Sequence, residues 1–184
     1  MTTRRDFLVA CGASFAALAV GTRTNDANAA PVGDPLAIIV AKESALNDLT
    51  LYELKRLYSG DKTQGPDGTD LIPLNRSPAA PERIGFDRSV LGMSQEEVAR
   101  YWIDRRIRGQ GAAPKSVDPA AVAQRIVTKL NGSIAYVNAK EVIPQVKMVR
   151  IDGKLPGQPG YPVTFVNSAG GSSAHLDGRL WRLF

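Results

Sequence analysis

The stretch of this sequence most able to do chemistry contains Arg76, Ser77 and Arg83. Arg76 and Ser77 follow the apolar run at residues 71–74, and a loop of small residues leads from them into a predicted helix that contains Arg83. The planar fork of an arginine guanidinium matches the oxygens of phosphate, and a serine hydroxyl can add a further hydrogen bond. These three residues are therefore candidate ligands for a small oxyanion such as phosphate.

The same arginines have acidic neighbours, which leaves a second interpretation open. Asp70, Glu82 and Asp87 are close enough in sequence to pair with Arg76 or Arg83 as ordinary surface ion pairs. Glu82 also adds a negative charge near the place where an anion would bind. The sequence thus predicts either an anion site or a set of ion pairs that binds no ligand.

Other kinds of site have little support in the sequence. The chain of 184 residues has one histidine, His175, and one cysteine, Cys11, which are too few for a zinc site. It carries no dinucleotide or Walker motif. The formal net charge of +5 is spread along the chain without a nucleic-acid motif. We therefore expect a protein that is not an enzyme, with no metal, no cofactor and no nucleic-acid partner.

The elements that would position the arginines alternate between strands and helices. The apolar run at residues 36–41 predicts a strand buried on both faces, as in a parallel sheet between helices. Two capping boxes predict helix starts, because the hydroxyl and the carboxylate of each box satisfy free backbone N–H groups. These boxes are Thr50 with Glu53, and Ser94 with Glu97. The alternation predicts an α/β domain with a mixed sheet covered by helices.

The remaining elements follow from turn residues and apolar spacing. A helix is expected at residues 81–91, ended by Gly92, and another with Asp118 as its N-cap. Short strands are expected at residues 71–74, 134–137, 146–151 and 163–166. The buried helix faces are predicted to comprise Val98, Tyr101, Trp102 and Ile107, and then Val122, Ile126, Val127 and Leu130. The cluster at residues 105–108 is interpreted as a solvated helix end, whose positive charge complements the helix dipole.

The first 29 residues have the order of an export signal. Arg4 and Arg5 precede a short apolar run, and a small-residue cleavage site follows at residues 27–29. The paired arginines are typical of the twin-arginine route. Cleavage after Ala29 and lipidation at Cys11 both stay open. We expect an export signal at residues 1–29, a folded domain at residues 30–166, a flexible tail at residues 167–184, and a periplasmic or secreted location.

Several stretches in order resemble the phosphate-binding proteins of bacterial phosphate ABC transporters, which belong to the type 2 periplasmic-binding-protein class. The resemblance rests on "LAIIVAKES", "LTLYELKRLYSGDKTQGPDGTDLIPLNR", "GQGAAPKSV", "LNGSIAYV" and "GYP". It includes Tyr58-Ser59-Gly60, Asp67-Gly68, Arg76, and the strand with Gly132, Ile134, Tyr136 and Val137. It spans about residues 36–162, and the chain is shorter than the two-lobed members. The resemblance therefore implies one lobe of such a protein.

The resemblance also implies a function and a departure from it. Members normally follow the arginine with a Ser-Gly-Thr run that binds phosphate, whereas this chain has Ala80, Pro81 and Glu82 there. Proline removes a backbone donor. The implied function is capture of phosphate or another small oxyanion for ABC-type uptake or sensing, with a membrane transporter as partner. The alternative is an envelope interaction module that keeps the scaffold, binds no ligand and contacts an envelope protein.

Overall fold

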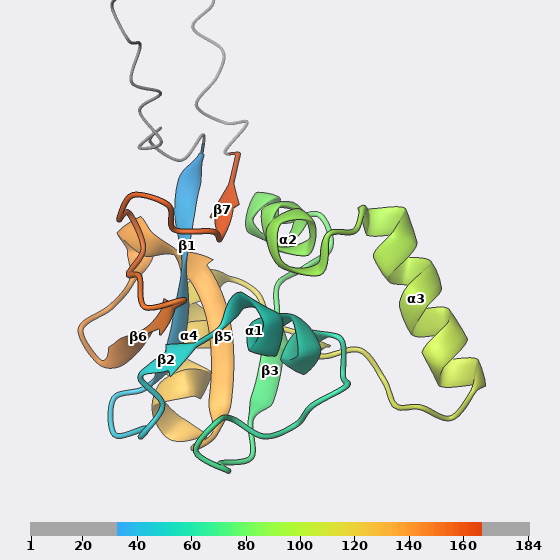
Figure 1. The fold of residues 1–184 in the computed structure, drawn as a ribbon, viewed down its shortest axis with the longest axis horizontal. Coiled ribbons are helices and arrows are strands. Elements are labelled where there is room, and N and C mark those ends of the chain that lie inside the picture. The colour runs from blue at the N-terminus through green and yellow to red at the C-terminus, as the bar shows by residue number, and fades with distance from the viewer. Residues whose placement is uncertain (1–32, 167–184) are drawn as a thin grey trace, which may run out of the picture.

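The central strand β1, Asp34–Ala41, is buried on both faces along almost its whole length. In the computed structural model, which describes residues 33–166, it lies between β5, Ser133–Asn138, and β6, Val146–Ile151 (Figure 1). Both neighbours run antiparallel to it, with Leu36 opposite Asn138 and Ile38 opposite Val149. The expected burial is confirmed, but the expected parallel pairing of this strand is wrong. Helices on both faces bury the strand whatever the direction of its neighbours.

The sheet has seven strands in the order β2-β6-β1-β5-β3-β4, and β7 pairs with the first residues of β1. Parallel pairing occurs between β2 and β6, between β3 and β5, and between β3 and β4. The predicted mixed sheet is therefore confirmed. The strands not yet given are β2, Asp48–Leu49; β3, Ile72–Asn75; β4, Lys115–Ser116; and β7, Thr164–Phe165.

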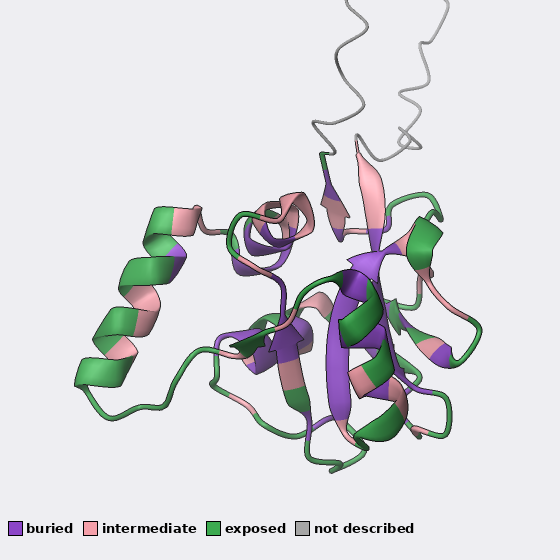
Figure 2. Cartoon of the chain, turned by 180° about the vertical axis from the view of Figure 1, so that it is seen from behind, coloured by how far each residue is buried: buried purple, intermediate pink, exposed green. Residues whose placement is uncertain are grey.

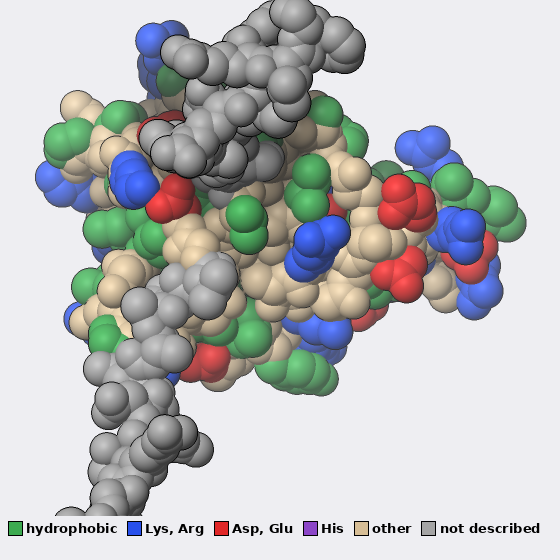
Figure 3. All heavy atoms as spheres, turned by 90° about the horizontal axis from the view of Figure 1, so that it is seen from above, with side chains coloured by type: hydrophobic (Ala, Val, Ile, Leu, Met, Phe, Trp, Pro, Cys, Tyr) green, Lys and Arg blue, Asp and Glu red, His purple; other side chains and the backbone are tan. Residues whose placement is uncertain are grey.

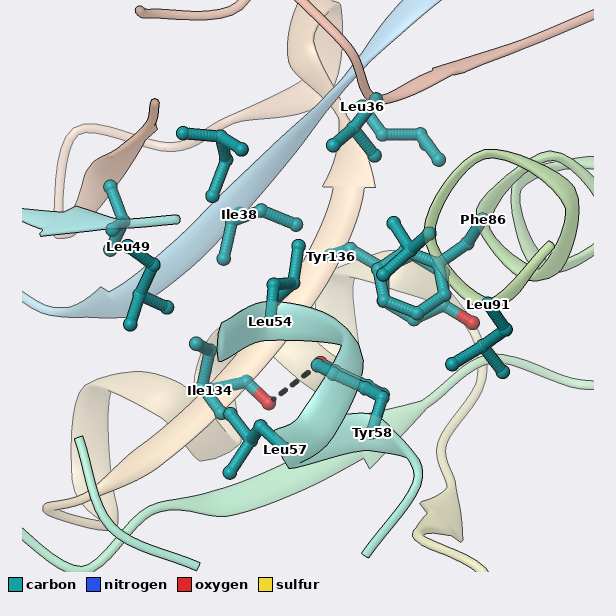
Figure 4. Close-up of a cluster of buried hydrophobic side chains, with 14 of the residues drawn as sticks. Leu36, Ile38, Leu49, Leu54, Leu57, Tyr58, Phe86, Leu91, Ile134 and Tyr136 are labelled. Atoms are coloured by element: carbon teal, nitrogen blue, oxygen red, sulfur yellow. Dashed lines mark hydrogen bonds between the residues drawn. The ribbon is translucent and has the colours of Figure 1, made fainter. Parts of the chain in front are cut away.

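Helices pack on the two faces of the sheet and create two hydrophobic clusters. Alternate residues of β1 point to opposite faces, so Leu36, Ile38 and Val40 join one cluster, while Ala37 and Ile39 join the other. Side chains from α1, Leu51–Tyr58, and from α2, Pro81–Phe86, belong to the first cluster (Figure 4). The second contains α4, Ala120–Lys129. Between β5 and β6 lies a short 3-10 turn at Ala139–Glu141.

Both predicted capping boxes are present. The Thr50 hydroxyl accepts from the Glu53 backbone N–H at 3.1 Å, and the Glu53 carboxylate accepts from the Thr50 N–H at 3.1 Å. Ser94 and Glu97 make the same exchange at the start of α3, Gln95–Ile107. The predicted helix over residues 81–91 is also present, although α2 passes into a π-helical turn at Asp87–Leu91 before Gly92 ends it in the left-handed conformation.

Helix α3 extends away from the sheet, and most of its surface is exposed (Figures 1 and 2). Only Val98 of its predicted face is buried, while Ile107 is 78% exposed. The predicted face is therefore wrong at Ile107. Tyr101 and Trp102 are half-buried, since the Tyr101 hydroxyl donates to the Ser59 carbonyl and Trp102 packs against the first cluster. Basic and acidic side chains are interspersed over the part of the surface that it forms (Figure 3).

Arg105 connects α3 to the rest of the molecule. Its guanidinium donates to Asp61 at 2.6 Å, to the Tyr101 hydroxyl at 2.8 Å, and to the carbonyls of Gly60 and Gln110 at 3.2 Å. It also lies over the rings of Tyr101 and Trp102. The interpretation of residues 105–108 as a solvated helix end is thus wrong for Arg105, whose charge is used internally.

Helix α4 differs from expectation in its start and in its buried face. Pro119, not Asp118, occupies the N-cap position, and no side chain caps the helix there. Of the predicted face, Val127 is fully buried, while Val122 and Leu130 are substantially exposed. The small side chains of Ala120 and Ala123 let the helix approach the sheet instead. None of the helices described between residues 33 and 166 is long and apolar enough to cross a membrane.

Candidate anion-binding site

The candidate site begins where β3 ends. Asn75 and Arg76 are both buried there, against the fully buried Tyr136 of β5. The Arg76 backbone N–H donates to the Asn75 side-chain oxygen at 3.2 Å and to the Tyr136 hydroxyl at 3.3 Å. The Tyr136 hydroxyl donates in turn to the same Asn75 oxygen. These hydrogen bonds determine where the Arg76 side chain leaves the sheet.

A single carboxylate bridges Arg76 and Ser77. One Asp118 oxygen lies 2.6 Å from Arg76 Nη1, and the other accepts from the Ser77 backbone N–H at 2.6 Å. Arg76 Nη1 also donates to the Val117 carbonyl at 3.4 Å. The Asp118 side chain is 36% exposed, whereas that of Arg76 is 9% exposed. A fixed guanidinium and a backbone N–H together thus hold two oxygens of one anionic group at the edge of solvent.

Arg83 makes a different kind of ion pair. Its Nε lies 2.6 Å from Asp87 one helical turn away, and both side chains are buried. Arg83 Nη1 also donates to the Arg76 carbonyl at 3.4 Å. Burial raises the pKa of the Asp87 carboxyl, against the opposing effect of Arg83. The second Asp87 oxygen is buried without a hydrogen-bond partner among the described residues.

Aromatic rings form the inner wall behind the arginines. Phe86 stacks on Tyr136 with ring centroids 4.0 Å apart, and Tyr58 packs against Phe86 at 4.6 Å (Figure 4). The Tyr58 hydroxyl donates to the carbonyls of Leu74 and Ile134. Burial raises the pKa of both tyrosines, so each hydroxyl keeps the proton that it donates. The wall is therefore neutral, and the nearby charges belong to the arginines and their carboxylates.

The structure brings the three predicted ligands into one neighbourhood, but in unequal roles. Arg76 and Ser77 both contact Asp118, and Arg83 donates a hydrogen bond to the Arg76 carbonyl. Ser77 uses its backbone N–H there rather than its hydroxyl. Of the acidic partners considered from the sequence, Asp87 pairs with Arg83, while Asp70 accepts from Gln64. The predicted ion-pair interpretation is thus correct for Arg83, although the pair is buried rather than on the surface.

Sequence reasoning missed the residue that completes the site. Asp118 precedes a proline and a helix, which predicts an N-cap, and no local signal connects it to Arg76. Its role depends on the parallel pairing of β4 with β3, which places Lys115 opposite Leu74 and Ser116 opposite Asn75. Tyr136 had a signal, since it belongs to the strand motif that supported the resemblance.

Two larger cavities lie elsewhere on the described surface. One, of about 500 Å³, lies between α2 and β7 and is lined by Gly85, Arg88 and Phe165 among others. The other, of about 450 Å³, lies between α1, β3 and α3. Neither cavity is lined by Arg76, Ser77 or Arg83. Residues 33–166 hold no group of three His, Cys, Asp or Glu side chains able to bind a metal ion.

Comparison with known proteins places the fold. No protein-family model and no curated protein matches the chain. Among solved structures, it is similar to an ABC-type phosphate transport receptor from Vibrio cholerae, with 18% identity, a TM-score of 0.54 and coverage of 67% of this chain and 48% of that one. PstS from Borrelia burgdorferi is similar over 67% and 49%, with 18% identity and a TM-score of 0.52.

A further similar structure was solved with its ligand. It is a protein from Clostridium perfringens described as a phosphate ABC transporter substrate-binding protein with bound phosphate, at 20% identity and a TM-score of 0.56, over 76% of this chain and 58% of that one. The chain thus spans about half the length of the solved proteins that it matches. It has the fold of one lobe of a phosphate-type periplasmic binding protein.

Proposed function

We propose that this chain is an exported, phosphate-binding-protein-like domain that binds a small oxyanion through Arg76 and Ser77, for ABC-type uptake or sensing. The observation that carries the proposal is the bridging of Arg76 Nη1 and the Ser77 N–H by the two oxygens of Asp118. Two oxygens of a phosphate can occupy the same two positions. Charge-assisted hydrogen bonds of this kind are the strong ones in proteins.

Binding requires Asp118 to leave, and its exposure permits that. The Asp118 carboxylate is at the edge of solvent, so its rotation into water exposes a charge that water can solvate. Arg76 stays in place, because its backbone is held by Asn75 and Tyr136. In this proposal Arg83 positions Arg76 through its carbonyl, and the Ser77 hydroxyl adds a donor.

The fold supports the same proposal in more general terms. The similar structures are phosphate transport receptors and substrate-binding proteins, which suggests binding rather than catalysis and a membrane transporter as the partner. An extracytoplasmic location follows from the same class, together with the predicted export signal at residues 1–29. The domain limits of 30–166 and a separate tail at 167–184 are part of this proposal.

A second function is favoured by the same ion pair. Asp118 pairs with Arg76 Nη1 and the Ser77 N–H without any ligand, and Asp87 pairs with Arg83. Arg76 Nε is buried without a hydrogen-bond partner among the described residues. A chain whose anion site is permanently filled by its own carboxylate is an interaction module that keeps only the scaffold. The two functions differ in whether Asp118 exchanges with an anion in solution.

Calorimetric titration of the full chain with phosphate, sulfate and acetate tests the proposal. We expect saturable binding of one oxyanion, lost in Arg76→Ala and unchanged in Arg150→Ala, an exposed arginine on β6. Asp118→Ala is expected to bind about tenfold more tightly, because an internal competitor lowers apparent affinity by the fraction of open sites. No heat from either the wild type or Asp118→Ala, with both folded, would favour the interaction module.

A further inference from the structure

The cavity of about 450 Å³ between α1, β3 and α3 is separate from the anion site. Leu57, Pro73, Leu74, Trp102 and Pro114 form its apolar walls, and Lys115 is the charged residue of its lining. This volume lies within the range of small-molecule pockets, which combine apolar walls with a few placed polar groups.

Arg105 holds the walls of this cavity together. It donates to the Gly60 carbonyl at the end of α1 and to the Gln110 carbonyl in the loop after α3. Gly60 and Gln110 both line the cavity. The same guanidinium lies 5.9 Å from the Trp102 ring centroid. Three parts of the lining are thus fixed by one side chain, and the cavity is formed before any ligand arrives.

The Trp102 ring is held from a second direction. Its Cη2 would lie 3.1 Å from a side-chain carbon placed at Gly60, so the indole packs directly on the backbone at the end of α1. Trp102 is only half-buried and packs against the first hydrophobic cluster. A half-exposed indole with a fixed orientation is a surface on which a flat ring stacks.

The charge at the cavity is positive. Lys115 makes no ion pair with any residue between 33 and 166. A smaller hollow that shares Trp102 is lined by Arg106, which likewise makes no ion pair within this range. An anionic group complements these cations, whereas a cationic ligand is repelled.

We propose that this cavity is a binding site for a small molecule with one flat apolar ring and one carboxylate. The ring lies against Trp102 and the prolines, and the carboxylate faces Lys115. The proposal does not depend on the anion site, since neither Arg76 nor Asp118 lines this cavity.

Fluorescence of Trp102 tests the proposal in the full chain. Trp181→Phe removes the other tryptophan, so the remaining emission comes from Trp102. We expect phenylacetate to change this emission saturably, and acetate to have no effect. The neutral analogue 2-phenylethanol is expected to bind about tenfold more weakly, because it cannot form the charge-assisted hydrogen bond to Lys115.

Matched variants decide whether this cavity is the site. Lys115→Gln is expected to weaken phenylacetate binding about tenfold, while Lys129→Gln, which removes an exposed lysine on α4, leaves it unchanged. The proposal is overturned by no saturable response, or by a response that Lys115→Gln leaves intact. It is also overturned if sedimentation shows that the chain is a dimer and the Trp102 fluorescence of that dimer does not respond to phenylacetate. A second copy of the chain would then cover the cavity.

Discussion

Two arginine–aspartate pairs share a buried arginine but differ in the exposure of the aspartate. Both pairs have a nitrogen–oxygen distance of 2.6 Å, and both arginines are buried. Arg83 pairs with Asp87 within one helical turn, and the Asp87 side chain is 3% exposed. Arg76 pairs with Asp118 across the β3–β4 edge, and its partner lies at the edge of solvent.

The difference separates a structural pair from one that can exchange. Breaking the Arg83–Asp87 pair leaves a charge without water, which is very costly. Breaking the Arg76–Asp118 pair leaves Asp118 in solvent and opens Arg76 to another anion. Two arginines with similar sequence surroundings therefore have different roles, and the exposure of the carboxylate distinguishes them.

The largest effect is expected from removing Arg83. Arg83→Met leaves Asp87 buried without its partner, and we expect the free energy of unfolding to fall by about 3–5 kcal/mol. Urea unfolding measures this loss. Arg88→Met is the control, because Arg88 is exposed on the following turn. The double variant Arg83→Met, Asp87→Leu should recover most of the loss, since it buries no charge. A loss below about 1 kcal/mol in the single variant would mean that this pair is no more structural than an exposed one.

A pH series sharpens the same comparison. The pKa of Asp87 is raised from 3.8 by burial, so the folded state binds its proton more tightly than the unfolded state does. The stability that this tighter proton binding contributes is fully present below pH 3.8. It is lost as the pH rises through the folded-state pKa of Asp87. We therefore expect the wild type to lose stability relative to Asp87→Asn as the pH is raised through this window.

Asp61 provides a control of opposite sign for that series. Its pKa is lowered from 3.8, first by the Ser59 hydroxyl and then by Arg105. Its contribution is present above pH 3.8 and is lost as the pH falls through the folded pKa. As the pH rises, the wild type should therefore gain stability relative to Asp61→Asn, whereas it should lose stability relative to Asp87→Asn. Urea unfolding from about pH 3 to pH 7 measures both variants. If their stabilities changed in the same direction relative to the wild type, the opposite pKa shifts of Asp61 and Asp87 would be contradicted.

The smallest effect is expected at Asp118. Asp118→Ala removes an exposed carboxylate and leaves the buried Arg76 without its partner. Urea unfolding should therefore show a loss above the roughly 1 kcal/mol of an exposed pair and below that of Arg83→Met. A cost as large as that of Arg83→Met would show that Asp118 is a fixed structural group and cannot exchange with an anion.

The sequence predicted local features of the fold well. Both capping boxes, the end of the helix at Gly92 and the buried run at residues 36–41 depend on neighbouring residues, and the structure confirms them. The direction of the neighbours of β1 was wrong, because an apolar run reports burial and not pairing. The face of α3 was wrong at Ile107, which follows the helical period but lies at the exposed end of the helix.

The candidate site was predictable only in part, because one of its contacts joins residues that lie far apart in the sequence. Arg76, Ser77 and Arg83 were identified from residue types and from the resemblance, and the structure places them near one another. Asp118 was not identified, since its contact with Ser77 joins residues 41 positions apart. Only the β3–β4 pairing brings them together, and two-residue strands such as β4 leave almost no pattern in a sequence.

The position of β1 at the centre of the sheet also determines when the protein can fold. β1 is the first strand described, yet its partners β5 and β6 lie near the other end of the domain. During synthesis this apolar strand therefore waits, with both edges unpaired, until residue 151 has emerged. Long-range pairing of this kind folds slowly, on a scale of about milliseconds to seconds, and leaves the waiting segment open to aggregation. Any truncation before β6 removes a neighbour of the central strand, so the domain acquires its core late and as a unit.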